Sequence, residues 1–127
     1  MSERLSRFQN VHMSGIKGAG MTALAELLTG QGVKITGSDT DEVFFTDNIL
    51  KNLKIKYAEH FAPDNIPVNA QAIIYSTAYS REKNTELEAA WASSMRVWSD
   101  PEALGMLTRE KLRLSVWGTH GKTTRSA

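Results

Sequence analysis

Short apolar runs alternate with longer segments of helical pattern along the chain, and this alternation limits the possible folds more than any other feature of the sequence. Parallel strands need a long return connection, usually a helix, so the alternation is typical of a parallel sheet. Such connections are right-handed in nearly all proteins, which places helices on both faces of the sheet. The predicted strands are residues 11–14, 33–37, 55–57, 72–76, 96–98 and 114–117.

Four helices are predicted between these strands. The first, about residues 19–31, carries Met21, Leu24, Leu27 and Leu28 on one face, a stripe suited to packing on a sheet. The others are predicted at residues 46–53, at 83–93, and from Asp100, as N-cap, to about Glu110. The sequence therefore predicts an α/β fold: a Rossmann-like, three-layer domain with a mainly parallel sheet.

Composition excludes several classes of protein. The 15 basic and 14 acidic residues are interleaved and give a formal charge of +1, so neither nucleic acid nor a membrane surface is an expected partner. No cysteine is present, and no His, Asp and Glu grouping has metal-ligand spacing. Residues 1–10 are polar, and no apolar run approaches the ~20 residues of a membrane span. We expect a cytoplasmic protein.

The first glycine-rich segment, Gly15-Ile16-Lys17-Gly18-Ala19-Gly20, lies between a predicted strand and a predicted helix. Glycine lets a diphosphate approach the main chain, and a helix N-terminus supplies free N–H donors and partial positive charge. The spacing matches the dinucleotide pattern G-x-G-x-x-G imperfectly, because Lys17 stands at a glycine position. The segment predicts a diphosphate site, and a tight turn without a ligand is the alternative.

Asp39 follows the second predicted strand, about twenty residues after the glycine-rich segment. In nucleotide-binding α/β folds, an acidic residue at this point bonds a ribose hydroxyl. Asp39 is therefore a candidate nucleoside ligand, with a helix cap or a solvated turn residue as the alternative.

A second glycine-rich segment, at residues 118–124, follows the last predicted strand and is typical of a nucleotide phosphate loop. In such loops backbone N–H groups enclose phosphate oxygens, a lysine adds charge and a Ser or Thr hydroxyl reaches Mg²⁺. Val116 replaces the first glycine of the strict G-x-x-x-x-G-K-[ST] pattern. Only three residues follow the segment, too few for its helix. We therefore expect the front part of a longer enzyme.

Residues 11–21, 37–39 and 118–124 resemble the Mur ligases, in that order and at that spacing. The similarity extends to residues 76–78 and 84–86. Members of this family have an N-terminal domain for a UDP-sugar, a central ATPase domain and a C-terminal domain for the incoming amino acid. The resemblance implies that residues 1–110 form a Rossmann-like UDP-N-acetylmuramate-binding domain. Residues 111–127 would then be the first strand and phosphate loop of a truncated ATP-binding domain.

The resemblance also implies a reaction of peptidoglycan synthesis. ATP would phosphorylate the lactyl carboxylate of UDP-N-acetylmuramate, and L-alanine would attack the acyl-phosphate. Activation is needed because a carboxylate is a poor electrophile. Residues 19–22 favour the alanine-adding member over the recycling member that adds a whole tripeptide. The chain alone is expected to be inactive and to bind no cofactor tightly, since the ATP helix and the amino-acid domain are absent.

Site residues are implied for both loops. Lys122 and Thr123 are the predicted catalytic residues: Lys122 neutralises the β- and γ-phosphates, and Thr123 holds the Mg²⁺ that arrives with ATP. The predicted ATP-binding residues are Gly118, Thr119, His120, Gly121, Lys122, Thr123 and Thr124. The residues predicted to bind the UDP-sugar are Gly15, Lys17, Gly18, Ala19, Gly20, Met21, Ser38, Asp39, His60, Ser76, Thr77 and Ala78.

Two of these residues keep an alternative role. Lys17, where the family commonly has glycine, is either a cation for the diphosphate or a solvated lysine. His60 either touches the nucleotide or is a surface histidine.

Two other functions stay open on the sequence alone. The fold and Asp39 also suit an NAD-binding domain of an oxidoreductase, although Lys17 and the second phosphate loop oppose it. The third possibility is a non-catalytic regulatory or interaction domain that kept a nucleotide fold. Because fold does not imply function, only the sites separate these alternatives.

Overall fold

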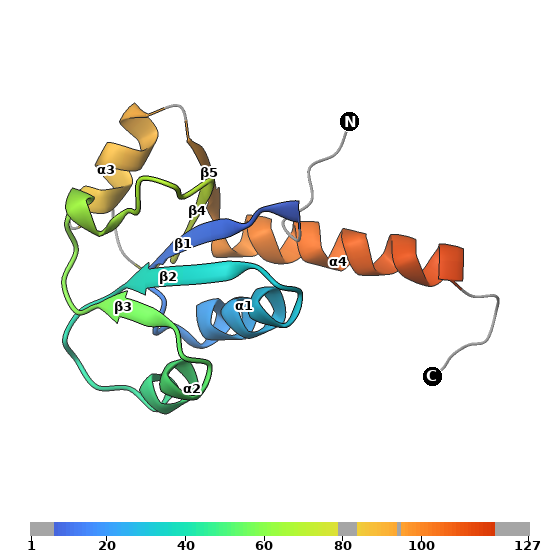
Figure 1. Ribbon diagram of the computed structural model, residues 1–127, viewed down its shortest axis with the longest axis horizontal. Coiled ribbons are helices and arrows are strands. Elements are labelled where there is room, and N and C mark those ends of the chain that lie inside the picture. Colours follow the sequence, from blue (N-terminus) through green and yellow to red (C-terminus); the bar gives the residue numbers. More distant parts are fainter. Residues whose placement is uncertain (1–6, 79–83, 94, 119–127) are drawn as a thin grey trace.

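The computed structural model describes residues 7–78, 84–93 and 95–118. Within them, five strands form an entirely parallel sheet in the order β3-β2-β1-β4-β5 (Figure 1). The strands are β1 (Asn10–Ser14), β2 (Lys34–Ser38), β3 (Lys56–Ala58), β4 (Ala72–Tyr75) and β5 (Arg96–Ser99). Each of these strands was predicted, with its ends shifted by at most one residue. The predicted α/β, Rossmann-like fold class is confirmed.

Helices cover both faces of the sheet. From β1 the chain passes outward through α1 (Ala19–Gly30) and α2 (Thr46–Asn52) to β3, and then returns across the sheet to β4 and β5. Right-handed connections that run in opposite directions place their helices on opposite faces. Accordingly, α1 and α2 lie on one face, and α3 (Thr85–Ala92) and the 3₁₀ turn η2 (Pro63–Asn65) lie on the other (Figure 1). Helix α4 (Asp100–Gly118) lies beside α1.

The main apolar core lies between the sheet and the layer of α1, α2 and α4. Strands β1 and β2 contribute Val11, Met13 and Ile35 to it. The helices contribute Met21, Leu24, Ala25, Leu28, Leu50, Ala103 and Leu107. Three residues of the predicted α1 stripe are therefore buried, while Leu27 is 37% exposed.

The opposite face of the sheet carries a buried polar cluster. His12, whose side chain points away from the apolar core, lies 2.9 Å from a carboxylate oxygen of Glu86 in α3. The Ser38 hydroxyl donates to the same oxygen at 2.7 Å. Asn84 caps α3 by accepting from the Glu86 N–H, and its amide donates to the Ser14 hydroxyl at 2.7 Å. These bonds satisfy the polar groups that α3 buries.

Helix α4 differs from its prediction at both ends. Ser99, not Asp100, is the N-cap: its hydroxyl accepts from the Glu102 N–H, and its N–H donates to the Glu102 carboxylate, which is a capping box. At the other end, α4 continues through residues 111–118, so the strand predicted at 114–117 is wrong.

The length of α4 has a physical cause. A strand needs a neighbour for its backbone groups, and among the described residues none is available at 114–117, whereas a helix pairs those groups internally. The second half of α4 extends beyond the sheet (Figure 1). No helix in the described ranges combines the length and apolar character needed to cross a bilayer.

Candidate functional site at the carboxyl edge of the sheet

The carboxyl ends of the parallel strands meet at one edge of the sheet, where ligands of doubly wound folds bind. The chain leaves β1 toward β2 on one side, and β4 pairs with β1 on the other, so the topological switch point lies between β1 and β4. Residues 15–18 follow β1, and residues 76–78 follow β4. The two predicted substrate loops therefore flank the switch point.

The glycine-rich loop after β1 is anchored to β2. Gly15 has a φ of 87°, a conformation that favours glycine. The N–H groups of Gly15 and Ile16 both donate to the Ser38 carbonyl, at 2.8 and 3.0 Å. Ile16 packs onto Gly37, where a Cβ would lie only 2.6 Å from Ile16 Cδ1. The close approach of Ile16 thus requires glycine at position 37.

The N-terminus of α1 carries no capping side chain. Gly18 is the N-cap, and no acidic residue lies in the first turn. Gly18, Ala19 and Gly20 are exposed, whereas the Met21 side chain is in the core. A Cβ at Gly20 would have only an ordinary contact, 3.9 Å from Asp100 Oδ2. This terminus therefore keeps the donors and the partial positive charge that bind phosphate.

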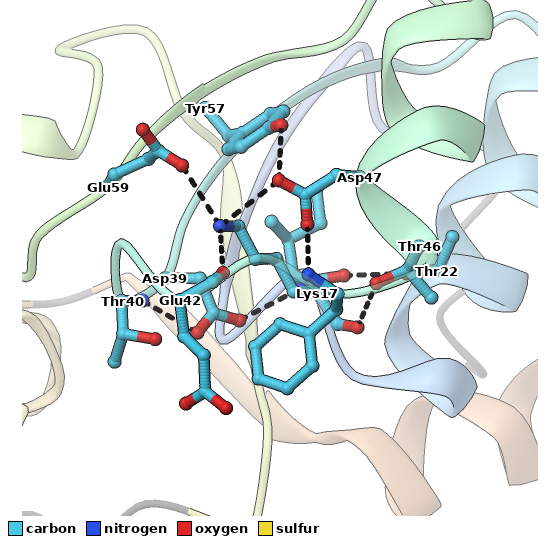
Figure 2. Close-up of polar contacts among 11 residues, drawn as sticks. Lys17, Thr22, Asp39, Thr40, Glu42, Thr46, Asp47, Tyr57 and Glu59 are labelled. Carbon is cyan, nitrogen blue, oxygen red and sulfur yellow. Dashed lines mark hydrogen bonds and ion pairs between the residues drawn. The ribbon is translucent and has the colours of Figure 1, made fainter.

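Lys17 is buried in the middle of this loop and its ammonium group is enclosed by oxygen atoms (Figure 2). Nζ donates to the Glu42 carbonyl at 2.7 Å and to the Glu59 carboxylate at 3.0 Å, and it lies 3.3 Å from Asp47 Oδ2. The solvated-lysine alternative is therefore wrong. The ammonium group has three N–H donors, and these three acceptors occupy them, so it is not directed at a diphosphate.

Hydrogen bonds and charge pairing together outweigh the effect of burial on the pKa of Lys17 and of Asp47. Burial alone would lower the pKa of Lys17, but the hydrogen bonds to Glu59 and Asp47 and their charges raise it above its ordinary value. Burial acts to raise the pKa of Asp47, yet the Phe44 N–H and the Lys17 ammonium lower it. Burial and the neighbouring Asp47 raise the pKa of Tyr57, whose hydroxyl donates to Asp47. Lys17 and Asp47 are consequently both charged at neutral pH.

Asp39 is placed as predicted, directly after β2, but its carboxylate bonds within the protein. One oxygen accepts from the Lys17 N–H at 2.8 Å, and the other accepts from the Thr40 N–H at 2.7 Å (Figure 2). The residue is only 1% exposed. In this arrangement Asp39 fixes the glycine-rich loop rather than facing a ribose.

Of the remaining predicted substrate residues, Ser38 alone points away from the carboxyl edge of the sheet. Thr77 and Ala78 are exposed beside the switch point, and Ser76 is buried there with its hydroxyl accepting from the Ala78 N–H. His60 is exposed after β3. Ser38 is not at the site surface, because its hydroxyl points to Glu86 on the other face of the sheet. The structure thus brings together the α1 N-terminus and residues 76–78, and it separates Ser38 from them.

Three residues that surround Lys17 were missed from the sequence: Asp47, Tyr57 and Glu59. The only available signal was that a lysine inside an apolar strand-to-helix connection, if buried, needs acidic partners. Residues 119–124, which hold most of the predicted ATP site, lie outside the described residues, and Gly118 is the last residue of α4. Among the described residues, no cluster of three His, Cys, Asp or Glu side chains could hold a metal ion.

Comparisons with known proteins show the family to which the chain belongs. The family model described as "Mur ligase family, catalytic domain" matches residues 10–112. A Treponema pallidum protein named UDP-N-acetylmuramate–L-alanine ligase is 41% identical over 117 residues, which are 92% of this chain and 24% of that protein. A protein of the same name from Chlorobium chlorochromatii is 38% identical over 123 residues, 97% of this chain and 26% of that protein.

Solved structures share the fold. The UDP-N-acetylmuramate–alanine ligase MurC of Thermotoga maritima superposes with a TM-score of 0.69 at 23% identity, covering 80% of this chain and 23% of that one. A murein peptide ligase of Psychrobacter arcticus gives a TM-score of 0.69 at 23% identity, over 76% of this chain and 20% of that one. The chain spans about a quarter of the length of the curated relatives that it matches. It belongs to the Mur ligase family.

Proposed function

We propose that the chain is the UDP-N-acetylmuramate-binding part of an ATP-dependent ligase that joins L-alanine to UDP-N-acetylmuramate. The observation that carries this proposal is the exposed, uncapped N-terminus of α1 at the switch point, in a chain 41% identical to a relative named for that reaction. The amide donors of an uncapped helix suit a diphosphate without any metal or lysine contact.

Binding is proposed to use the two loops that flank the switch point. The N–H groups of Ala19, Gly20 and Met21 receive the diphosphate, because they belong to the first turn of α1. Residues 76–78 contact the ligand from the β4 side, and His60 lies toward the nucleoside. Lys17 and Asp39 hold the loop in place from within the protein.

The chemistry is proposed for the longer ligase. There, Mg-ATP is a substrate held by residues 118–124, with Lys122 on the phosphates and Thr123 on Mg²⁺. The lactyl carboxylate attacks the γ-phosphorus and ADP leaves; the amine of L-alanine then attacks the acyl-phosphate carbonyl and phosphate leaves. Residues 1–110 are assigned to the UDP-sugar domain and 111–127 to the ATP-binding domain. A cytoplasmic location is part of the same proposal, because ATP is a substrate of the reaction.

Titration calorimetry of this chain with UDP-N-acetylmuramate, UDP, NAD and Mg-ATP tests the binding proposal. We expect heat from the two UDP ligands and little from NAD or Mg-ATP. Gly20→Ala should weaken UDP binding, because a methyl group in the exposed first turn blocks close approach of the diphosphate, whereas its own surroundings accept a Cβ. Gly30→Ala, at the other end of α1 with nothing within 4 Å of the added Cβ, is the matched control.

Two results would overturn the proposal. Binding of NAD in place of the UDP ligands would indicate an oxidoreductase domain, and equal effects of Gly20→Ala and Gly30→Ala would remove the α1 N-terminus from the site. The choice of amino acid needs the longer ligase. Phosphate release that depends on a tripeptide, and not on L-alanine, would replace the alanine assignment by the recycling one.

A further inference from the structure

Every polar group of Lys17 has a partner within the protein. Its N–H donates to the Asp39 carboxylate at 2.8 Å, and its carbonyl accepts from the Thr46 hydroxyl at 2.5 Å. Its ammonium bonds the Glu42 carbonyl and Glu59, and pairs with Asp47. A residue in the centre of a proposed phosphate loop therefore offers the ligand neither its charge nor its backbone.

These partners come from two parts of the chain, the continuous stretch 39–47 and Glu59 (Figure 2). Asp39 follows β2, Glu42 belongs to the segment 41–45, Thr46 and Asp47 begin α2, and Glu59 follows β3. Segment 41–45 is largely open to solvent, with Val43 81% and Phe45 73% exposed, although Phe44 is half-buried. The Glu42 bond thus links this exposed segment directly to the glycine-rich loop.

The surroundings of the ammonium group keep it from solvent. The Lys17 side chain is 0% exposed, and the rings of Phe44 and Tyr57 lie with their centroids 6.0 and 5.6 Å from Nζ. A pocket of about 650 Å³ beside α2 and β3 is lined by Phe44, Asp47, Tyr57 and Glu59 but not by Lys17. These side chains stand between the cation and any molecule in the pocket.

We propose that Lys17 is a positioning residue: it sets the phosphate loop and segment 41–45 in one arrangement, and it controls affinity for the nucleoside diphosphate without touching it. The inference rests on the proposed function for the identity of the ligand. Lys17 and Asp47 are both buried, so removing either one leaves the other as an uncompensated buried charge, and Glu59 and the aromatic rings complete the enclosure.

Calorimetry with UDP distinguishes positioning from direct contact by the direction in which Glu59→Gln changes the affinity for UDP. Lys17→Met and Glu59→Gln should both weaken binding, Lys17→Met by at least about tenfold, the order seen when the supporting partners of a site are removed. The double variant should bind no worse than Lys17→Met, since both changes break the same support. If Lys17 touched the diphosphate, Glu59→Gln would leave affinity unchanged or raise it, and Lys17→Met would reduce the salt dependence of binding.

The same variants must stay folded for the affinities to be compared, and the structure indicates which of them should. The Glu59 side chain is 50% exposed, so Glu59→Gln should fold normally. Lys17→Met leaves the buried Asp47 carboxylate without its cation, and Lys17→Met with Asp47→Asn removes that cost. Thermal melting confirms that each variant is folded at the temperature of the titration. Unchanged affinity in folded Lys17→Met would overturn the proposal.

Hydrogen exchange tests the support without a ligand. Lys17→Met should speed exchange of the bonded amides of residues 15–18 together with that of Phe44, whose N–H donates to Asp47 at 3.0 Å, and should leave β1 and β4 protected. Lys51→Met, an exposed lysine of α2 beside the same pocket, is the matched control and should change neither segment. Uniform acceleration, or acceleration in one segment only, would overturn the coupling. This result stands even if UDP fails to bind, an outcome that would refute only the proposed function.

Discussion

His12 Nε2 lies 2.9 Å from Glu86 Oε1, and both side chains are 0% exposed between β1 and α3. The Asn65 amide and the Ala62 N–H donate to the other Glu86 oxygen, at 2.7 and 3.2 Å. One carboxylate therefore connects the centre of the sheet, η2 and α3. Buried charges persist when they are paired and fully hydrogen-bonded, so we expect this face to depend on Glu86 as the other face depends on its apolar core.

Acid should remove the contribution of Glu86 to stability. Burial acts to raise its pKa, but the hydrogen bonds from His12, Asn65 and Ser38 lower it below the ordinary 4.5. A group with a lowered folded pKa contributes fully above its unfolded pKa and loses that contribution as the pH falls through the folded value. The free energy of unfolding, measured by urea titration, should fall more steeply below pH 4.5 in the unmodified chain than in Glu86→Gln.

Glu88→Gln is the control for this measurement, because Glu88 lies on the same helix and is exposed. It should follow the unmodified chain at every pH. Parallel curves for all three proteins would contradict the assignment of acid sensitivity to Glu86.

Gly37→Ala should destabilise the fold by about 1–3 kcal/mol, the usual cost of overpacking. The added Cβ would lie 2.6 Å from Ile16 Cδ1, and Ile16 is held by the backbone bonds of its loop. Gly30→Ala, where the Cβ meets nothing within 4 Å, should be neutral or stabilising. Thermal unfolding of both variants gives the comparison, and equal melting temperatures would contradict the packing explanation.

Asn84 has two roles that separate variants can divide. Asn84→Ala loses the α3 cap and leaves the buried Ser14 hydroxyl without its donor, so we expect a loss of about 1–3 kcal/mol. Asn84→Ser keeps an N-cap acceptor for the Glu86 N–H without adding a buried charge, but its short side chain no longer donates to Ser14. If the cap contributes to stability, chemical denaturation should place the free energy of unfolding of this variant between those of Asn84→Ala and the unmodified chain. If both variants lose the same free energy of unfolding, the cap does not contribute.

Ser99→Ala should cost about 1 kcal/mol, because it breaks the capping box that begins α4. Ser99→Thr keeps a hydroxyl at the same place and should retain most of the stability. The measurement is the midpoint of urea unfolding. A Thr variant as unstable as the Ala variant would point to packing around Ser99 instead of capping.

The fold was predictable because its signals are local. Alternating apolar runs and helical stripes located the strands from β1 to β5 to within one residue. The error at residues 114–117 has the opposite origin. Their apolar pattern suits a strand, but a strand exists only with a neighbour, and sequence pattern says nothing about which neighbours are present.

The site was predictable only in part. The glycine pattern located the exposed N-terminus of α1, since that signal lies within a few residues. The environment of Lys17 was not predictable, because its partners Asp39, Asp47 and Glu59 lie 22 to 42 positions away and converge only in the folded chain. Both alternatives for Lys17 assumed that the side chain leaves the protein, whereas it turns inward.

The short outer strands of the sheet also bear on how the protein behaves in concentrated solution. The sheet ends in β3, with three residues, and in β5, with four. An edge strand is a template for pairing with a second chain, and its strength as a template grows with its length. Both edge strands are short, and each begins with an exposed cation, Lys56 in β3 and Arg96 in β5. These edges should therefore disfavour edge-to-edge aggregation.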